Sequence, residues 1–320
     1  MQFSATGVIP ACLLPFNEDL SIDEPSFRKH LRDVAAVRGV SAITVNGHAS
    51  EVSSCTFEEQ ERVLHITLDE IGERMPIVSG VYSDSSMDAA RIAAMAERMG
   101  ASALLVFPSA VFARGVQQRP EMAIEHFKRV AEGSKLPLII FRYAMASGMG
   151  YTIETLLRLI DEVPTICAIK DSCGDPMVHE QTIRALKNHG RRIKILTTHS
   201  AWLLPSLVLG CDGLLSGAGS TIADLQVALF EAVQHGELRE AQRLNDSVFA
   251  TTDAFYRTPA TDMHNRMKEA QVAIGRLPNA TVRPPLVKLS KGEIERITSL
   301  MKEAGIERAG ATAPRVLSGV

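Results

Sequence analysis

The sequence lacks long apolar runs, and we expect no segment that crosses a membrane or directs export. No apolar run approaches the roughly 20 residues that a transmembrane helix needs. Residues 1–10, MQFSATGVIP, have neither a basic flank nor a long apolar core, so we expect no signal peptide. The net charge is only -3 and no basic run occurs, which argues against binding to nucleic acid or to an anionic membrane.

Motifs for metal ligation, disulfide formation and phosphate binding by a P-loop are missing as well. The nine histidines show no HExxH or other paired ligand spacing, so we expect no metal site. Neither a GxSxG elbow nor a GxxxxGKS/T loop occurs. The five cysteines are scattered and form no CxxC pair, which predicts free thiols in a reducing cytoplasm: Cys12, Cys55, Cys167, Cys173 and Cys211. With 46% hydrophobic and 22% charged residues, the composition is that of an ordinary globular protein.

What the sequence does contain is a regular alternation of short apolar runs with longer amphipathic segments. Eight such runs are predicted to be buried strands. They span residues 8–14, 41–45, 75–80, 102–107, 137–141, 165–170, 193–196 and 212–215. The segments between them have helical periodicity and recognisable ends, such as the capping box of Thr56 with Glu59 and the stop at Gly100.

Eight even strand–helix units predict a (β/α)8 barrel over residues 1–235. The main alternative is a doubly wound open sheet, but no dinucleotide-binding loop follows the first strand. From residue 236 only helical patterns remain, so we expect residues 236–306 to form a helical extension packed on the barrel. Residues 307–320 are small and polar, which predicts a loose tail.

The sixth predicted strand ends in a lysine. Residues 165–170, TICAIK, form an apolar run that carries Lys170 to the end of the sheet where active sites of such barrels lie. Burial would lower the pKa of this lysine, because surroundings without water disfavour the ammonium form. A neutral amine can attack a carbonyl carbon and form a Schiff base. Taken alone, the segment favours the plainer interpretation of Lys170 as a surface lysine just past a strand, and only the rest of the chain reverses this preference.

Three further strand ends carry residues that can take part in chemistry. After the second strand, the turn at Gly47 exposes backbone N–H groups that can bind a carboxylate, and His48 can carry a proton. After the fifth, alternation places Phe141 and Tyr143 on one face, with a phenol at the pocket mouth. After the eighth, residues 213–220, GLLSGAGS, open a helix in the manner of a phosphate site. A solvated histidine and a packing tyrosine are the plainer alternatives.

Taken together, these segments resemble the dihydrodipicolinate synthase and N-acetylneuraminate lyase family of class I aldolases, over about residues 6–303. The strand-six lysine in an eight-unit frame, combined with the loop after strand two, is the specific part of the resemblance. The matching segments are GVIPACLLPF at 7–16, NGHASE at 46–51, GVYSDSS at 80–86, FPSAVF at 107–112, AIKDSCG at 168–174 and GLLSGAGS at 213–220.

The resemblance implies a lyase that forms a Schiff base between Lys170 and a pyruvate-like 2-oxo acid, without any other cofactor. The substrate carboxylate would lie against the backbone N–H groups of His48 and Ala49, beside Gly47, and the Leu215 carbonyl would line the pocket. The family also implies a cytoplasmic homo-oligomer, a tetramer built as a dimer of dimers, that acts on a small molecule.

The chain departs from the family pattern at the positions that transfer protons. Phe141 stands in place of the catalytic tyrosine of strand five, and His48 replaces the hydroxyl residue after the loop glycine. Ser109 and Ala110 replace the tyrosine pair of the family's TPYY segment, and Ala146 replaces an arginine that contacts substrate in the synthase branch. These departures argue against the lysine-biosynthesis synthase and against sialic acid cleavage.

Two residues are candidates for the missing acid or base. His48 is favoured because imidazole titrates near neutrality, and Tyr143 is the alternative because it follows Phe141 on the same strand face. Glu51 keeps its family position and is interpreted as structural, bonding backbone amides of its own loop. Two alternatives to the lyase remain open: a non-catalytic barrel that binds a 2-oxo acid or sugar acid, and a phosphate-ligand barrel that uses residues 213–220.

Overall fold

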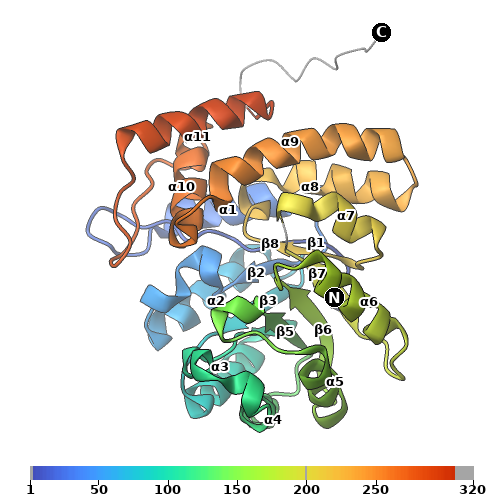
Figure 1. Cartoon of the computed structure of the whole chain (residues 1–320). Helices are drawn as coiled ribbons and strands as arrows, with labels where there is room; N and C mark the ends of the chain where they lie inside the picture. The colour runs from blue at the N-terminus through green and yellow to red at the C-terminus, as the bar shows by residue number, and fades with distance from the viewer. Residues whose placement is uncertain (1–2, 199, 307–320) are drawn as a thin grey trace.

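The computed structural model describes residues 3–198 and 200–306, and its centre is a sheet of eight parallel strands (Figure 1). The strands are β1 (Gly7–Pro10), β2 (Ile43–Val45), β3 (Ile77–Val81), β4 (Ala103–Val106), β5 (Leu138–Arg142), β6 (Ile166–Asp171), β7 (Lys194–Thr197) and β8 (Gly213–Ser216). Neighbours in sequence pair in parallel from β2 to β8, and β1 pairs with β8. A bridge between Ala11 and Thr44 links the segment after β1 to β2, so the sheet closes into a barrel.

The predicted (β/α)8 barrel is therefore confirmed, and the open-sheet alternative is wrong because β1 and β8 are neighbours. All eight predicted strands are present, with small differences at their ends. The largest difference is at β1, which ends at Pro10 although the apolar run continues to residue 14. Residues 11–14 are apolar because they are buried in the interior, and burial alone does not make a strand.

The eight helices of the barrel cover its outside. They are α1 (Glu24–Ala35), α2 (Phe57–Ile71), α3 (Ser86–Met99), α4 (Glu121–Gly133), α5 (Ile153–Glu162), α6 (Pro176–Lys187), α7 (Leu203–Val208) and α8 (Gly219–Gln234). The predicted capping box is formed at the start of α2, where Thr56 and Glu59 each bond the other's backbone N–H. Gly100 ends α3 in the left-handed conformation, as predicted. None of the described helices has the length and apolar character needed to cross a bilayer.

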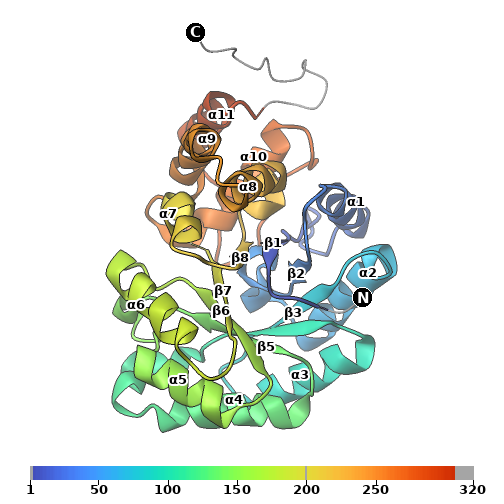
Figure 2. The same cartoon turned by 90° about the vertical axis from the view of Figure 1, so that its right-hand side faces the viewer.

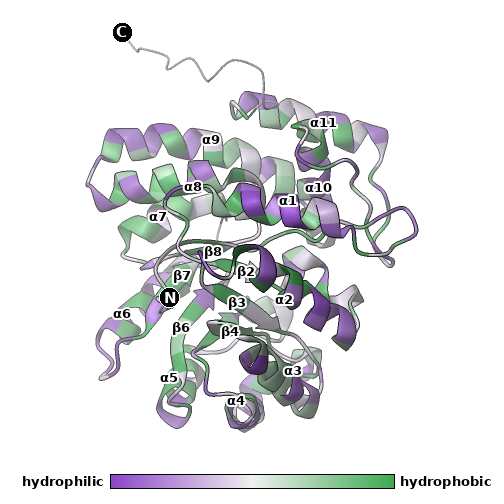
Figure 3. Ribbon diagram, turned by 180° about the vertical axis from the view of Figure 1, so that it is seen from behind, coloured by the Kyte–Doolittle hydropathy of each residue, from purple (hydrophilic) through white to green (hydrophobic). Residues whose placement is uncertain are grey.

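Strand side chains alternate between two separate apolar cores. One core fills the barrel interior and includes Ile139, Ala168 and Leu196, whereas the other lies between strands and helices and includes Ile140 and Ile169. In the ribbon coloured by hydropathy, the central strands are largely apolar, whereas the surrounding helices carry both apolar and polar residues (Figure 3). Because Lys170 is two residues beyond Ala168, it belongs to the inward-facing set.

Three helices follow the barrel and lie together beside α8, above β8 and β1 in Figures 1 and 2. They are α9 (Leu238–Tyr256), α10 (Met263–Ala273) and α11 (Lys291–Glu303). The predicted extension thus begins between Gln234, where α8 ends, and Leu238. The predicted tail, residues 307–320, lies outside the described residues.

A buried ion pair ties this extension to the loop after β2. Lys268 of α10 donates a hydrogen bond to the carboxylate of Glu51, and only 1% and 4% of the two side chains are exposed. The same carboxylate accepts the backbone N–H of Arg283, at 3.0 Å. Glu51 is therefore structural, but the prediction that it bonds amides of its own loop is wrong. Its partners lie more than 200 residues away in sequence, where spacing cannot reveal them.

Replacing Lys268 by methionine is expected to lower the free energy of unfolding by about 3–5 kcal/mol, because the Glu51 carboxylate would stay buried without its cation. Urea denaturation measures this loss. Lys291→Met is the matched control, since Lys291 is 91% exposed and its ion pair with Glu295 spans 3.8 Å. Equal stability of the two variants would contradict a structural role for the buried pair.

Candidate active site

A cavity of about 460 Å3 lies where the carboxyl ends of the strands meet the C-terminal helices. Every strand except β3 contributes a wall residue at or near this end. These residues are Ala11, Gly47, His48, Ala49, Leu105, Phe107, Phe141, Tyr143, Lys170, Ser172, Thr198 and Gly217. The cavity therefore occupies the position at which active sites occur in this fold.

Lys170 projects into this cavity near the end of β6 and is 7% exposed. Its Nζ lies 3.9 Å from the centre of the Phe141 ring, which belongs to the neighbouring residue on β5. A ring face favours the ammonium form, but burial disfavours it more and lowers the pKa of Lys170 to about 7. At pH 7 roughly half of the amine is then uncharged, against about 0.03% at an ordinary lysine pKa. A neutral amine in this cavity has the protonation state that a nucleophile needs.

His48 and Tyr143 are joined by a hydrogen bond between Nε2 and the phenol oxygen. Burial and the nearby Lys170 lower the pKa of His48 to about 4. Burial raises the pKa of the Tyr143 phenol above its usual value. The expectation that His48 titrates near neutrality is therefore wrong: both groups are uncharged at pH 7. The sequence offers His48 and Tyr143 as alternatives, whereas the fold joins them in one hydrogen-bonded pair.

Phe141 and Tyr143 share a face, as alternation predicted, with ring centroids 4.6 Å apart. Arg142 between them points the other way and is buried against α6, where it donates to Thr182 Oγ1 at 2.7 Å. The ring of Phe107 packs edge-on against His48 at 4.8 Å. The aromatic rings therefore hold the His48–Tyr143 pair beside Lys170.

The other predicted binding residues lie in or below the cavity wall. Gly47 and Ala49 line it, and Ala49 is buried in a short 3-10 turn, η1 (His48–Ser50). At β8 the wall is formed by Gly217, whereas the Leu215 side chain packs in the barrel interior below. The loop after β2 passes close to the backbone of β3 at Gly80. A Cβ at this position would lie 1.9 Å from the backbone oxygen of Asn46, so the position requires glycine.

The serine hydroxyls of residues 213–220 are already hydrogen-bonded within the described part of the protein. The Ser216 hydroxyl accepts a hydrogen bond from Gln226 at 3.3 Å, and the Ser220 hydroxyl donates to the Gly217 carbonyl at 2.8 Å. Gln271 of α10 donates to the Ser220 carbonyl at 2.6 Å. The loop packs α8 against α10, so the phosphate-ligand alternative gains no support.

Sequence reasoning missed the contribution of the C-terminal helices and of the segment after β7. Thr252 and Tyr256 of α9, Met263 and His264 of α10, and Trp202 all line the cavity. A Cβ on Gly217 would lie 2.9 Å from His264 Nε2, so glycine is needed there for the imidazole to approach. The available signal was the polarity of α10, MHNRMKEAQVA, whose polar side chains are largely buried.

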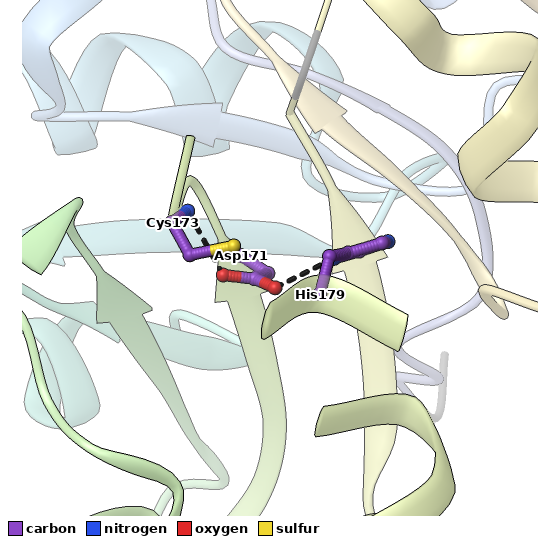
Figure 4. Close-up of side chains that lie close together, drawn as sticks. All are labelled: Asp171, Cys173 and His179. Carbon is purple, nitrogen blue, oxygen red and sulfur yellow. Dashed lines mark hydrogen bonds and ion pairs between the residues drawn. The ribbon is translucent and has the colours of Figure 1, made fainter. Parts of the chain in front are cut away.

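A second cluster lies behind Lys170, between β6 and α6 (Figure 4). Asp171 points out of the barrel, and its carboxylate bonds His179 Nδ1 at 2.6 Å and the Cys173 backbone N–H at 3.0 Å. Arg142 lies 3.6 Å from the same carboxylate, and His179 Nε2 faces the Cys211 sulfur at 3.3 Å. This network holds in place the strand end that carries Lys170.

Asp171, Cys173 and His179 also place their potential ligand atoms within 4.8 Å of one another, a grouping that sequence spacing did not reveal. The Arg142 cation beside Asp171 disfavours a second cation, and the carboxylate is already bonded. We therefore interpret the cluster as support for β6, and the expectation of no metal site stays a prediction.

The chain is similar in sequence to proteins named as synthases or as synthase-like lyases along most of its length. A sequence model of the dihydrodipicolinate synthetase family matches residues 4–304. A 4-hydroxy-tetrahydrodipicolinate synthase of Methanopyrus kandleri is 26% identical over 307 residues, which are 96% of this chain and 98% of that protein. An uncharacterized DapA-like lyase of Halobacterium salinarum is 29% identical over 255 residues, which are 79% of this chain and 80% of that protein.

Solved structures are similar in fold at lower sequence identity. YagE of E. coli K12, a prophage protein of the dihydrodipicolinic acid synthase family determined in complex with pyruvate, has a TM-score of 0.88 at 22% identity. The match covers 95% of this chain and 100% of that one. The dihydrodipicolinate synthase of Aquifex aeolicus has a TM-score of 0.84 at 23% identity and covers 95% and 99%. At these identities the likeness establishes the barrel with its C-terminal helices.

Proposed function

Because the chain belongs to the dihydrodipicolinate synthetase family and is a lyase of the class I aldolase type, we propose that Lys170 forms a Schiff base with a pyruvate-like 2-oxo acid. The observation that carries this proposal is a lysine amine inside the cavity whose pKa lies near 7. A barrel that only bound its ligand would gain nothing from such an amine, which favours catalysis over the non-catalytic alternative.

The chemistry at Lys170 follows from its neutral amine. The nitrogen attacks the C2 carbonyl of the 2-oxo acid, water leaves, and a protonated imine results. That imine withdraws electrons from C3, so that a proton can leave C3 or a bond beyond it can break. The substrate carboxylate is proposed to lie against the backbone N–H groups of His48 and Ala49, which donate to no other backbone oxygen within the described part of the chain.

The His48–Tyr143 pair is proposed to move the proton. Tyr143 takes a proton from the substrate while its own passes to Nε2 of His48, which becomes imidazolium; the reverse transfer returns it. A pair that is uncharged at pH 7 can do this in either direction. Because Phe141 cannot transfer a proton, we propose that the physiological reaction differs from lysine biosynthesis, although the relative from Methanopyrus kandleri is named as the synthase. A homotetramer, a dimer of dimers, remains part of this proposal.

Incubation with pyruvate and borohydride, followed by intact mass and peptide mapping, tests the proposal directly. We expect one reduced pyruvyl group per chain, on Lys170. If the adduct forms on another lysine, or if no adduct forms with a panel of 2-oxo acids, the proposed Schiff base on Lys170 is contradicted. In the second case the non-catalytic ligand-binding barrel is favoured.

The rate of trapping should depend on pH through the amine itself. Burial holds the pKa of Lys170 near 7, so the reactive neutral form is scarce below that pH and abundant above it. We expect the initial rate of adduct formation to rise about tenfold per pH unit below 6 and to level off above 8. Mass spectrometry of samples quenched across this range measures the midpoint. A midpoint near 10 would show an unperturbed lysine.

No cofactor beyond Lys170 is proposed for the reaction. Dialysis against a chelator is therefore expected to leave both adduct formation and turnover unchanged. Loss of turnover with retained adduct formation, restored by a divalent metal, would instead assign a function to the Asp171–Cys173–His179 cluster. Measuring adduct formation and turnover on the same sample distinguishes a metal needed in catalysis from one needed for folding, because loss of the fold would abolish both.

A further inference from the structure

The cavity wall beyond Lys170 is almost without charge. Of the wall residues that the structure describes, Lys170 is the one lysine, and arginine, aspartate and glutamate do not occur among them. Burial lowers the pKa of His48, and burial together with His48 and Lys170 lowers that of His264. Both imidazoles are therefore neutral at pH 7. Once Lys170 has become an imine beside the carboxylate of the 2-oxo acid, no cation remains on the described wall for a second anion.

The wall is instead rich in aromatic surface. Phe141 and Tyr143 come from β5 on one side of Lys170, and Phe107 from β4 extends this side. Trp202 follows β7 on the other side, and Tyr256 reaches the cavity from α9. Aromatic side chains on this wall favour a flat or apolar ligand in contact with them.

The polar groups on the wall are neutral ones. Ser147, Thr198 and Thr252 contribute hydroxyls, of which those of Ser147 and Thr252 already donate to the carbonyls of Ala144 and Val248. His264 contributes an imidazole that approaches the Gly217 backbone. Such neutral groups can exchange a hydrogen bond with a ligand hydroxyl. They cannot repay the cost of taking a carboxylate or phosphate out of water, which is several kcal/mol without a cation.

From this wall we infer that the carbonyl partner of the 2-oxo acid is an uncharged, largely apolar aldehyde, with an aromatic aldehyde fitting best. The inference rests on the proposed Schiff-base function and specifies its substrate class. In the condensation direction, C3 of the Lys170 enamine attacks the aldehyde carbon, and the C3–C4 bond forms. The aldehyde oxygen takes a proton and becomes a hydroxyl, and water hydrolyses the imine to restore the lysine. Cleavage is the reverse, and releases the aldehyde and the 2-oxo acid.

Two pairs of aldehydes that differ by one carboxylate test the inference on the full chain. Pyruvate is supplied with benzaldehyde or 4-formylbenzoate, and with butanal or 4-oxobutanoate, and the condensation product is quantified by chromatography. We expect kcat/KM for the neutral member to exceed that of the charged member by about 100-fold or more in both pairs. Benzaldehyde should also exceed glyceraldehyde, a neutral but hydroxylated competitor.

A variant with a cation on the wall should reverse this discrimination. Met263→Arg introduces a guanidinium from α10, and we expect it to reduce the preference for benzaldehyde over 4-formylbenzoate at least tenfold. Met263→Leu is the matched control and should keep the preference. An unchanged preference in the arginine variant would contradict a discrimination set by the neutral wall.

Borohydride trapping with pyruvate, run on the same preparation, distinguishes a failure of the proposed Schiff-base function from a failure of the proposed substrate class. No adduct on Lys170 would overturn the proposed function itself. An adduct together with a preference for 4-formylbenzoate, for 4-oxobutanoate or for glyceraldehyde would overturn the substrate class and leave the Schiff base standing. An adduct with no condensation of any of these aldehydes would likewise overturn the substrate class.

Discussion

Replacing Lys170 by alanine is expected to reduce turnover by about 10⁴-fold or more and to remove the reduced pyruvate adduct, because no other amine occupies the described part of the cavity wall. The fold should survive. Lys170 Nζ makes a contact with the Phe141 ring and takes part in no ion pair among the described residues. Circular dichroism and thermal unfolding of the variant test this second half of the expectation.

Lys291→Ala provides the control for nonspecific trapping, since Lys291 is exposed on α11 far along the chain from the cavity. It should keep both adduct and turnover. Full activity of Lys170→Ala would rule out the Schiff-base mechanism. A Lys170→Ala protein that no longer folds would show instead that the amine supports the barrel, and Lys170→Arg or Lys170→Met would then separate folding from chemistry.

His48→Ala and Tyr143→Phe are each expected to lower kcat by about 10²–10³-fold, because each breaks the same proton path. Groups that act as one unit have non-additive effects. The double variant should therefore be about as slow as the slower single variant, and the multiplied effects of two independent sites are not expected. Steady-state kinetics of the four proteins, with one aldehyde and pyruvate, give this double-mutant cycle.

Two comparisons make the cycle specific. Phe141→Tyr, which restores the hydroxyl found in the family, is expected to change kcat much less than His48→Ala. His65→Ala removes an exposed histidine of α2 and should have no effect. If the loss of kcat in the double variant equals the product of the two single losses, His48 and Tyr143 act independently and do not share one proton path. If Phe141→Tyr changes kcat more than His48→Ala does, His48 does not take part in the proton transfer.

Much of the fold was predictable because it depends on local periodicity. The apolar run at residues 165–170 forms β6, and the Thr56–Glu59 capping box starts α2 as predicted. The strand predicted at residues 8–14 extends beyond the end of β1, because a continuous apolar stretch looks the same in sequence whether it is a strand or a buried connection. Helix α10 was predicted as a helix, but its buried polar face was not recognised, since no stripe of apolar residues marks it.

The candidate site was predictable to the level of single residues at strand ends. Lys170, His48, Phe141 and Tyr143 were named because alternation and the barrel frame place them at one end of the sheet. The hydrogen bond between His48 and Tyr143 could not be named, because the two residues are 95 positions apart and come from different strand ends. The roles of Trp202 and His264 were missed for the same reason.

The sequence by itself determined the order of strands and helices and the position of Lys170 at a strand end, because both follow from residues that are close in the chain. It also carried the motifs that resemble a lyase family. Only the tertiary structure decided the chemistry of those residues. The pKa of Lys170, the neutral state of His48, the Glu51–Lys268 ion pair and the uncharged wall all depend on burial and on contacts between distant segments. Burial and proximity are properties of the folded chain, and they are created when the barrel closes and the C-terminal helices pack against it.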